Sequence, residues 1–241
     1  MNLMEKVHER FNILNSLMWN AVSTKPALET VYRDLFVRDL TRLELNDLYY
    51  PVGGAANYGL LYLITRCFLE LPIRNAIELG AGQSSILLSR LNERLKKNAN
   101  ITTIEHDARW AENIQTKVNH RVKTADLVSK TVSGHRINFY GGTFFDPSIL
   151  YDFVLIDGPP ARNTEETVFN RLGALELIEK NLADDFVVIV DDAERRGESV
   201  LVDLIRRQLQ ENGREFKETA IMAAKQQAVF VAGSYFNAAY F

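Results

Sequence analysis

The stretch Ala76-Ile77-Glu78-Leu79-Gly80-Ala81-Gly82-Gln83-Ser84-Ser85 decides the fold of this chain. Its apolar first part, within residues 75–79, is short and bounded by turn residues, which predicts a buried parallel strand. After the glycines, leucines recur at helical spacing, and Ser84 and Ser85 are the expected caps of that helix. Two glycines between strand and helix allow a sharp turn and a close approach to a ligand. We therefore expect the first turn of a doubly wound α/β sheet, with free N–H groups at the helix start facing that ligand.

The glycine spacing also indicates which ligand this is. A dinucleotide fingerprint has a third Gly or Ala, and Ser85 stands there instead, which argues against an NAD(P)-dependent oxidoreductase. The pattern acid-x-Gly-x-Gly, which begins at Glu78, resembles motif I of the class I S-adenosylmethionine-dependent methyltransferases. The resemblance implies that one set of residues surrounds this cofactor: Glu78, Gly80, Ala81, Gly82 and Ser84. The alternative is an ordinary strand–turn–helix with fortuitous glycines.

Composition narrows the class of protein. The chain has 241 residues, of which 46% are hydrophobic and 24% charged, so it is long and apolar enough for one large α/β domain. The net charge of −3, without a basic stripe, argues against a nucleic-acid partner. No apolar segment approaches the length of a membrane span, and the N-terminus lacks the apolar core of a signal peptide. Cys67 is the single cysteine and lies in an apolar run, so we expect a core residue in a cytoplasmic protein.

A second strand is predicted at residues 101–105, and it ends in Glu105. A carboxylate at this strand end accepts hydrogen bonds from ribose hydroxyls in nucleoside-binding folds, about twenty residues after the glycine turn. Glu105 follows Gly82 by 23 positions. The segment from Glu105 to Trp110 also resembles the region after motif I in a bacterial methyltransferase group, which implies that His106 lines the cofactor pocket. A catalytic base is the other reading of His106.

A third strand is predicted at residues 121–125, and residues 126–147 read as irregular. In the resembled family the end of this strand approaches the adenine. Asp126 and the Gly142-Thr143 turn are the two candidates here, and the sequence does not choose between them.

Acidic side chains follow two further predicted strands. The fourth strand ends in Asp157 before Gly158-Pro159-Pro160, and the fifth, at residues 186–190, ends in Asp191 and Asp192. Neighbouring parallel strands lie about 5 Å apart, so these three carboxylates could share one hard cation such as Mg²⁺.

The arrangement is similar to the metal site of catechol-type and antibiotic-sugar O-methyltransferases. The resemblance implies that Asp157, Asp191 and Asp192 bind magnesium and that Asp157 lies beside the transferred methyl group, touching the cofactor. Two prolines stand where the catechol type has a lysine base, so that base has no counterpart here. If no metal ion is used, Asp157 is the catalytic residue expected, as general base. In the alternative reading, Asp157 contacts the substrate, and Asp191 or Asp192 pairs with Arg195.

The remaining segments complete the predicted architecture. Apolar stripes predict helices at residues 2–19 and after Pro26, and a third helix over about 55–71 follows an aromatic loop with Tyr49 and Tyr50. That loop either lines a pocket or packs in the core. Further helices are expected around 165–175 and up to Asn212-Gly213, and the runs 216–223 and 228–232 read as a closing hairpin with an antiparallel last strand.

We therefore predict an α/β fold: a doubly wound Rossmann-like seven-stranded sheet with a terminal antiparallel hairpin and an N-terminal helical extension. Residues 1–241 form a single domain, with residues 1–54 as the extension and residues 55–241 as the cofactor-binding core. The extension roofs the acceptor pocket or forms a homodimer contact. The resemblance implies S-adenosylmethionine-dependent O-methylation of a small hydroxylated molecule or sugar. The alternatives are an NAD(P)-dependent oxidoreductase and a catalytically inert S-adenosylmethionine-binding protein.

Overall fold

The structure is a computed structural model, and it describes residues 23–161 and 167–241. The helix predicted at residues 2–19 lies outside the described residues, as do Glu165 and Glu166 of the segment after Asp157.

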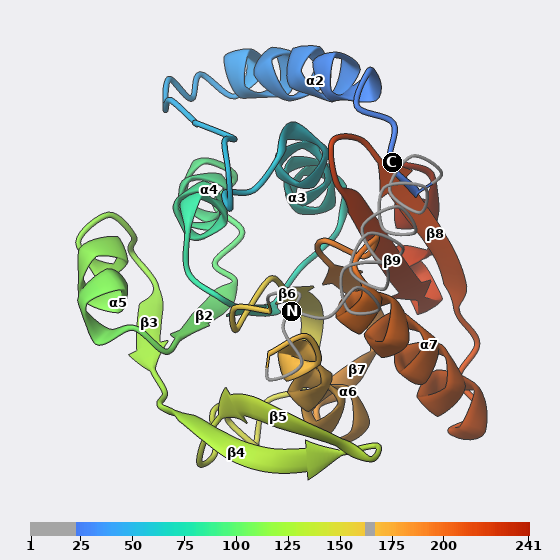
Figure 1. The fold of residues 1–241 in the computed structure, drawn as a ribbon. Coiled ribbons are helices and arrows are strands. Elements are labelled where there is room, and N and C mark those ends of the chain that lie inside the picture. The colour runs from blue at the N-terminus through green and yellow to red at the C-terminus, as the bar shows by residue number, and fades with distance from the viewer. Residues whose placement is uncertain (1–22, 162–166) are drawn as a thin grey trace, which may run out of the picture.

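One mixed sheet forms the centre of the molecule (Figure 1), with the strand order β3-β2-β1-β6-β7-β9-β8. Its strands are β1 (Asn75–Leu79), β2 (Asn100–Glu105), β3 (Arg121–Thr124), β6 (Tyr151–Ile156), β7 (Leu182–Val190), β8 (Lys217–Met222) and β9 (Gln226–Ala232). The first five in this order are parallel, and β9 lies antiparallel between β7 and β8. Every residue of β6 is buried, as expected for a central parallel strand that is covered on both faces. The predicted seven-stranded doubly wound sheet with an antiparallel last strand is confirmed.

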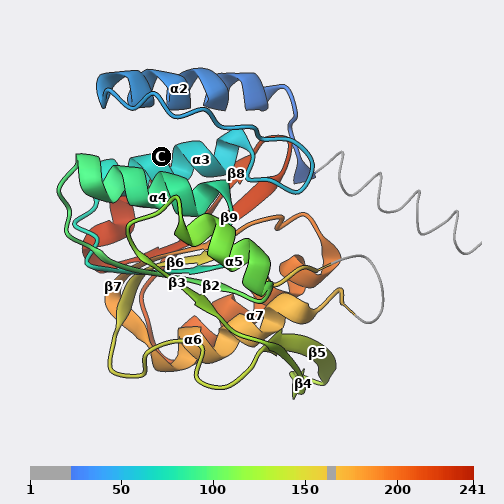
Figure 2. The same ribbon diagram turned by 90° about the vertical axis from the view of Figure 1, so that its left-hand side faces the viewer.

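Helices cover both faces of the sheet (Figure 2). On one face lie α3 (Tyr58–Glu70), α4 (Gln83–Arg94) and the C-terminal 3-10 segment η2 (Gly233–Tyr240), with α2 (Leu28–Arg42) outside α3. On the other face lie η1 (Asn170–Ala174), α6 (Leu175–Lys180) and α7 (Arg196–Glu211). The short helix α5 (Ala108–Gln115) packs against β2 and β3. Each face of the sheet has its own apolar cluster, and Cys67 is fully buried in the cluster on the α3 and α4 face.

Local signals explain where these helices begin and end. Asn57 caps α3, since its Oδ1 accepts from the N–H of Leu60 at 3.2 Å, so the helix predicted from residue 55 begins at Tyr58. Asp107 caps α5 by accepting from the N–H groups of Arg109 and Trp110. At the end of α7, Gly213 has a φ of +65°, which glycine adopts without strain.

Two segments differ from their predictions. Residues 126–147 contain an antiparallel pair, β4 (Leu127–Val132) and β5 (His135–Tyr140), set apart from the main sheet (Figure 1). Its turn residues Ser133 and Gly134 both have positive φ, as a tight hairpin turn requires. None of the six residues of β4 is buried and three are exposed, so the strand has no alternation of apolar residues that would reveal it in the sequence. The helix expected near 165–175 is instead the 3-10 segment η1 followed by α6, which has six residues.

The topology fixes where a ligand binds in a fold of this type. Strand order reverses between β1 and β6, and ligands of open α/β sheets bind beside the carboxyl ends of the strands at such a switch point. The turns after β1, β2, β6 and β7 all lie at this edge. Among the described residues, no helix is both long and apolar enough to cross a membrane.

Candidate active site

The turn after β1 touches the turn after β6. Gly80 has a φ of +96°, and a Cβ added there would lie 2.9 Å from the nitrogen of Gly158. A Cβ on Gly158 would lie 2.6 Å from the Cα of Gly80. The two loops therefore cross backbone to backbone, which only glycine at both positions allows.

Gly82 has a different role from Gly80. Its φ of −172° is extended backbone, which any residue adopts. A Cβ added at Gly82 would have Ser84 Oγ, at 3.9 Å, as its nearest neighbour. The protein itself therefore accepts a side chain at Gly82, and only a ligand that approaches the turn requires glycine there.

Glu78 supports the turn from below. Of the two serines expected to cap the helix, Ser85 takes part in capping, but from the third position of α4, because the helix begins at Gln83 with Gly82 as its N-cap residue. Ser85 Oγ accepts from the Gly82 N–H at 3.0 Å and donates to Glu78 Oε2 at 2.5 Å, while Thr103 Oγ1 donates to the same oxygen at 2.7 Å. Burial raises the pKa of Glu78 to about 7, although the hydroxyls of its serine and threonine partners lower it.

Glu105 holds the turn from the side. Its Oε2 accepts from the Ala81 N–H at 2.9 Å, and its Oε1 accepts from the N–H groups of His106 and Asp107 at 2.7 and 2.8 Å. Trp110 Nε1 donates to the carbonyl of Ala81 at 2.7 Å and is half exposed. The structure thus brings the predicted residues of the first two strand ends together around one backbone turn. His106 joins them, with Nδ1 2.6 Å from Glu105 Oε1.

The loop before α3 lies next to this turn. The side chain of Gln83, the first residue of α4, accepts from the Tyr50 N–H at 2.5 Å and donates to the Tyr50 carbonyl at 2.8 Å. Tyr49 packs edge-on against Phe36, with ring centroids 5.4 Å apart, and the side chain of Tyr50 is exposed. Tyr49 is therefore a packing residue, whereas the side chain of Tyr50 is exposed beside the turn after β1.

Tyr140, at the end of β5, is a site residue that the sequence did not reveal. It is 1% exposed, and a Cβ on Gly158 would lie 2.6 Å from its hydroxyl oxygen. That hydroxyl has no hydrogen-bond partner among the described residues. Burial, together with the charge of Glu105, raises the pKa of Tyr140 well above its ordinary value. A strand assignment for residues 135–140 would have been needed to place this side chain.

The same hairpin joins Asp126 to the glycines after β5, because the Gly141 N–H donates to the Asp126 carbonyl at 2.8 Å.

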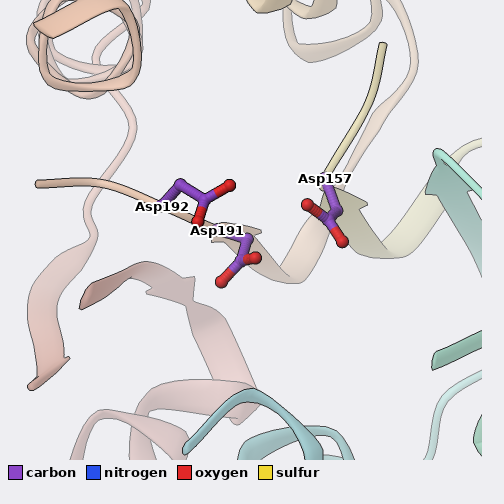
Figure 3. A group of neighbouring side chains, drawn as sticks. All are labelled: Asp157, Asp191 and Asp192. Atoms are coloured by element: carbon purple, nitrogen blue, oxygen red, sulfur yellow. The ribbon is translucent and has the colours of Figure 1, made fainter. Parts of the chain in front are cut away.

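Asp157, Asp191 and Asp192, called here the aspartate cluster, lie together as the sequence predicts. Figure 3 shows Asp157 after one strand and the other two after its neighbour. One carboxylate oxygen of each residue lies within 4.8 Å of the others. The parallel pairing of β6 and β7, in which Ile156 is opposite Val190, produces this juxtaposition.

Arg171, in η1, is buried beneath the aspartate cluster. It is 4% exposed, and its Nη2 lies 3.1 Å from Asp157 Oδ1 and 3.3 Å from Asp192 Oδ2. It also donates to the backbone carbonyls of Asp157 and Asp191 at 2.7 and 3.0 Å, and its Nη1 lies 3.4 Å from Glu198 in α7. Burial raises the pKa of Glu198 to about 7, although Arg171 lowers it.

Two more cations complete the cluster. Arg195 Nη1 lies 2.8 Å from Asp192 Oδ2, which is the pairing considered for Arg195 from the sequence. Lys225 Nζ lies 3.4 Å from Asp191 Oδ2 and 3.1 Å from Asp192 Oδ1. The sequence does not reveal that Arg171 and Lys225 belong to the site. For Lys225, the predicted closing hairpin contains the information needed. Because β9 runs antiparallel to β7, its first residues lie at the carboxyl end of β7.

The cations divide the cluster electrostatically. Burial raises the pKa of Asp157 well above its ordinary value, and the charge of Asp191 acts in the same direction. Burial would also raise the pKa of Asp192, but Arg171 and Lys225 lower it below its ordinary value. Burial would lower the pKa of Lys225, but Asp191 and Asp192 raise it above its ordinary value.

These contacts do not fit a magnesium ion in the same place. The three carboxylates have suitable oxygens for Mg²⁺. The Lys225 ammonium, however, bridges Asp191 and Asp192, and Arg171 bridges Asp157 and Asp192. A divalent ion shared by the three carboxylates would have to displace Lys225. The magnesium site therefore stays a prediction.

No family model matches the chain, and no curated protein matches its sequence significantly. It is similar to solved structures of methyltransferases at low identity. The SAH-bound O-methyltransferase from Bacillus cereus is 17% identical, covering 90% of this chain and 100% of that one, with a TM-score of 0.45. TomG from Streptomyces achromogenes, an O-methyltransferase of tomaymycin synthesis solved with SAM, is 18% identical over 90% and 99% of the two chains, with a TM-score of 0.43. The SAH-bound Podospora anserina methyltransferase PaMTH1 is 11% identical over 97% and 98%, with a TM-score of 0.49.

Proposed function

We propose that this chain is an S-adenosylmethionine-dependent methyltransferase that methylates a hydroxyl group of a small molecule or sugar. The observation that carries the proposal is the convergence, at the switch point of the sheet, of the glycine turn after β1 with the acidic strand ends after β2 and β6. A binding platform for a nucleoside with an amino-acid tail thus lies beside the carboxylate of Asp157. A cytoplasmic location is part of the proposal and is consistent with the single, buried thiol of Cys67.

The cofactor would lie across the turn of residues 80–82. The backbone of Gly82 leaves room for its amino-acid portion, since no protein atom lies within ordinary contact distance of a Cβ there except Ser84 Oγ. Glu105 would accept from the ribose hydroxyls, because each carboxylate oxygen can accept more than one hydrogen bond. Glu78 and Ser84 would act from beneath the turn, and His106 would line the nucleoside side.

We assign to Asp157 the role of binding the hydroxyl group of the methyl acceptor and taking its proton. Methyl transfer is an in-line displacement in which the acceptor oxygen–carbon bond forms as the carbon–sulfur bond breaks, and sulfur keeps the electron pair as a neutral thioether. The acceptor also loses its hydroxyl proton, and Asp157 would take it as general base. A raised pKa suits this role, and the Asp157 side chain retains 18% exposure towards an incoming acceptor.

Ligand-dependent stabilisation tests the cofactor class. A ligand that binds only the folded state raises the unfolding temperature. We expect S-adenosylmethionine and S-adenosylhomocysteine to raise it and NAD and NADP to leave it unchanged. Stabilisation by NAD or NADP alone would replace the proposal with the oxidoreductase alternative.

Substitution of Asp157 tests the chemistry separately from binding. We expect Asp157→Asn to abolish methyl transfer to a productive acceptor while S-adenosylhomocysteine affinity stays within about threefold, since the principal cofactor contacts come from the turns after β1 and β2. Unchanged turnover in Asp157→Asn would remove Asp157 from the reaction and leave the cofactor assignment in place.

A further inference from the structure

We infer that the ammonium group of Lys225 is the built-in cation of the aspartate cluster: it takes the place that a divalent metal ion would occupy and makes the site metal-independent. The inference rests on the proposed function only where it concerns methyl transfer. The exclusion of metal ions follows from contacts within this chain and can be measured without any cofactor.

Five of the six carboxylate oxygens of the aspartate cluster have a donor or a cation beside them. Asp191 Oδ1 accepts from Gln227 Nε2 at 2.6 Å, and Lys225 Nζ lies close to the other oxygen of Asp191 and to Asp192 Oδ1. Arg171 engages Asp157 Oδ1 and Asp192 Oδ2. Among the described residues, these contacts leave Asp157 Oδ2 as the one oxygen of the six without a donor or cation. Magnesium is usually held by one or two carboxylates at about 2.1 Å together with several waters. Here Lys225 and Arg171 already bridge the carboxylate oxygens through which two aspartates would bind such an ion jointly.

The backbone around Lys225 is held in place on both sides, and this matters because a loosely held lysine would yield to a metal ion. Lys225 lies in the turn between β8 and β9, and the turn closes through a bond from the Ala223 N–H to the Lys225 carbonyl at 2.9 Å. Glu29, in α2, accepts from the Ala224 N–H at 3.0 Å, and Glu194 accepts from the Gln226 N–H at 2.9 Å. The backbone on both sides of Lys225 is therefore fixed by carboxylates from other elements.

Burial strengthens this pairing. The Lys225 side chain is 12% exposed, and Asp191 and Asp192 are 0% and 3% exposed. A charge pair shielded from water in this way interacts more strongly than a surface pair, and removing one partner leaves an uncompensated buried charge. If Lys225 lost its charge, the two aspartates would need another cation, and a divalent ion is the one their geometry could then accept.

This arrangement makes Lys225 a positioning residue for the acceptor. Lys225, together with Arg171 and Arg195, compensates the charges of Asp191 and Asp192, so that Asp157 Oδ2 is the oxygen left to accept from an acceptor hydroxyl. The expected substrate is thus a hydroxyl compound recognised through one carboxylate oxygen, rather than a compound with two adjacent oxygens that chelate a metal ion.

Manganese binding, followed by electron paramagnetic resonance at neutral pH, tests the inference. We expect no Mn²⁺ bound to the wild-type protein at submillimolar concentration. Lys225→Met should gain a site that binds at least tenfold more tightly, and Asp191→Asn in that background should abolish it. Lys225→Arg should behave as the wild type because the positive charge is kept. Lys180→Met, which removes an exposed lysine from α6, is the matched control and should gain no site.

Two results would overturn the inference. One is a wild-type Mn²⁺ site of micromolar affinity that Asp191→Asn abolishes; the other is a folded Lys225→Met protein that gains no site. If Lys225→Met does not fold, Lys225→Gln replaces it and should gain the same Mn²⁺ site. If neither variant folds, the Mn²⁺ affinity of the wild-type protein alone decides. Absence of S-adenosylhomocysteine binding, with the manganese results as expected, would refute the proposed function and leave the role of Lys225 intact.

Discussion

The loops after β1 and β6 can cross at Gly80 and Gly158 only because neither residue has a Cβ atom. The sequence shows both glycines, but only Gly80 is recognisable from a motif, since the role of Gly158 depends on the loop that it meets. Gly82 shows the opposite case, because the protein does not need glycine there and a ligand would. Neighbouring glycines of one motif can therefore be separated into structural and ligand-facing positions by what surrounds them.

Gly158→Ala should destabilise the fold by about 1–3 kcal/mol, the usual cost of overpacking a well-filled site. The new methyl group would lie 2.6 Å from both Gly80 Cα and the Tyr140 hydroxyl, so one loop has to move. Urea unfolding measures the loss. Gly54→Ala is the control, because a Cβ at Gly54 has no neighbour within 4 Å. Equal stability of the two variants would show that the loops do not cross as described.

Glu78→Gln should change how stability depends on pH. The pKa of Glu78 is raised from 4.5 to about 7 in the folded state, so its contribution to stability is present below about pH 4.5 and is lost as the pH rises through about 7. Glutamine does not titrate. From about pH 5 to about pH 8, the stability of Glu78→Gln relative to the wild type should therefore increase by about 2.5 kcal/mol. Glu112→Gln, at an exposed position of α5, should show no such trend in the same unfolding series.

At the scale of elements, α2 connects parts of the molecule that are distant in sequence. Its buried residues Phe36 and Leu40 join the apolar cluster on the α3 and α4 face. Its first turn carries Glu29, which accepts from Asn57, Tyr58 and the hairpin turn at Ala224. Glu29 thereby fixes the turn that carries Lys225. That the extension roofs the acceptor pocket or forms a homodimer contact stays a prediction.

Phe36→Ala should lower the free energy of unfolding by about 3–5 kcal/mol, as expected for removing a fully buried phenylalanine. Val37→Ala, on the exposed side of the same helix, should cost less than about 1 kcal/mol. Because α2 carries none of the proposed cofactor contacts, we expect Phe36→Ala protein that remains folded to bind S-adenosylhomocysteine as the wild type does. A folded Phe36→Ala variant without affinity for S-adenosylhomocysteine would show that α2 does contribute to the cofactor site.

At the scale of the whole molecule, the sequence predicts the sheet well and its surroundings less well. The strand β6 and the part of β7 at residues 186–190 are largely apolar and are followed directly by acids, so the residue pattern alone places these carboxylates at one edge of the sheet. The four residues by which β7 begins earlier than predicted include two exposed aspartates, which hid them as strand. The exposed strand β4 has no apolar alternation, and the helix expected near 165–175 includes a 3-10 turn, so both differ from prediction.

The candidate site was predictable only in part, for a related reason. Its acids follow single apolar strands, whereas Arg171 in η1, Tyr140 in β5 and Lys225 in the β8–β9 turn reach the site only through tertiary packing. Charged residues in turns look alike in a sequence. What distinguishes Lys225 is that β9 returns antiparallel beside β7, and this sets the turn against the aspartates.

Calorimetric titration of S-adenosylhomocysteine into the wild type and Gly82→Val tests the central claim most directly. The structure accepts a Cβ at Gly82, so the variant should unfold at nearly the wild-type temperature without ligand. Thr131→Val, which places the same branched side chain on exposed β4, is the matched control, and the indole of Trp110 beside Ala81 offers a fluorescence signal of binding at the turn. We predict that the wild type and Thr131→Val bind the cofactor product and that folded Gly82→Val does not. Wild-type affinity in Gly82→Val, or absence of binding to the wild type, would contradict the account.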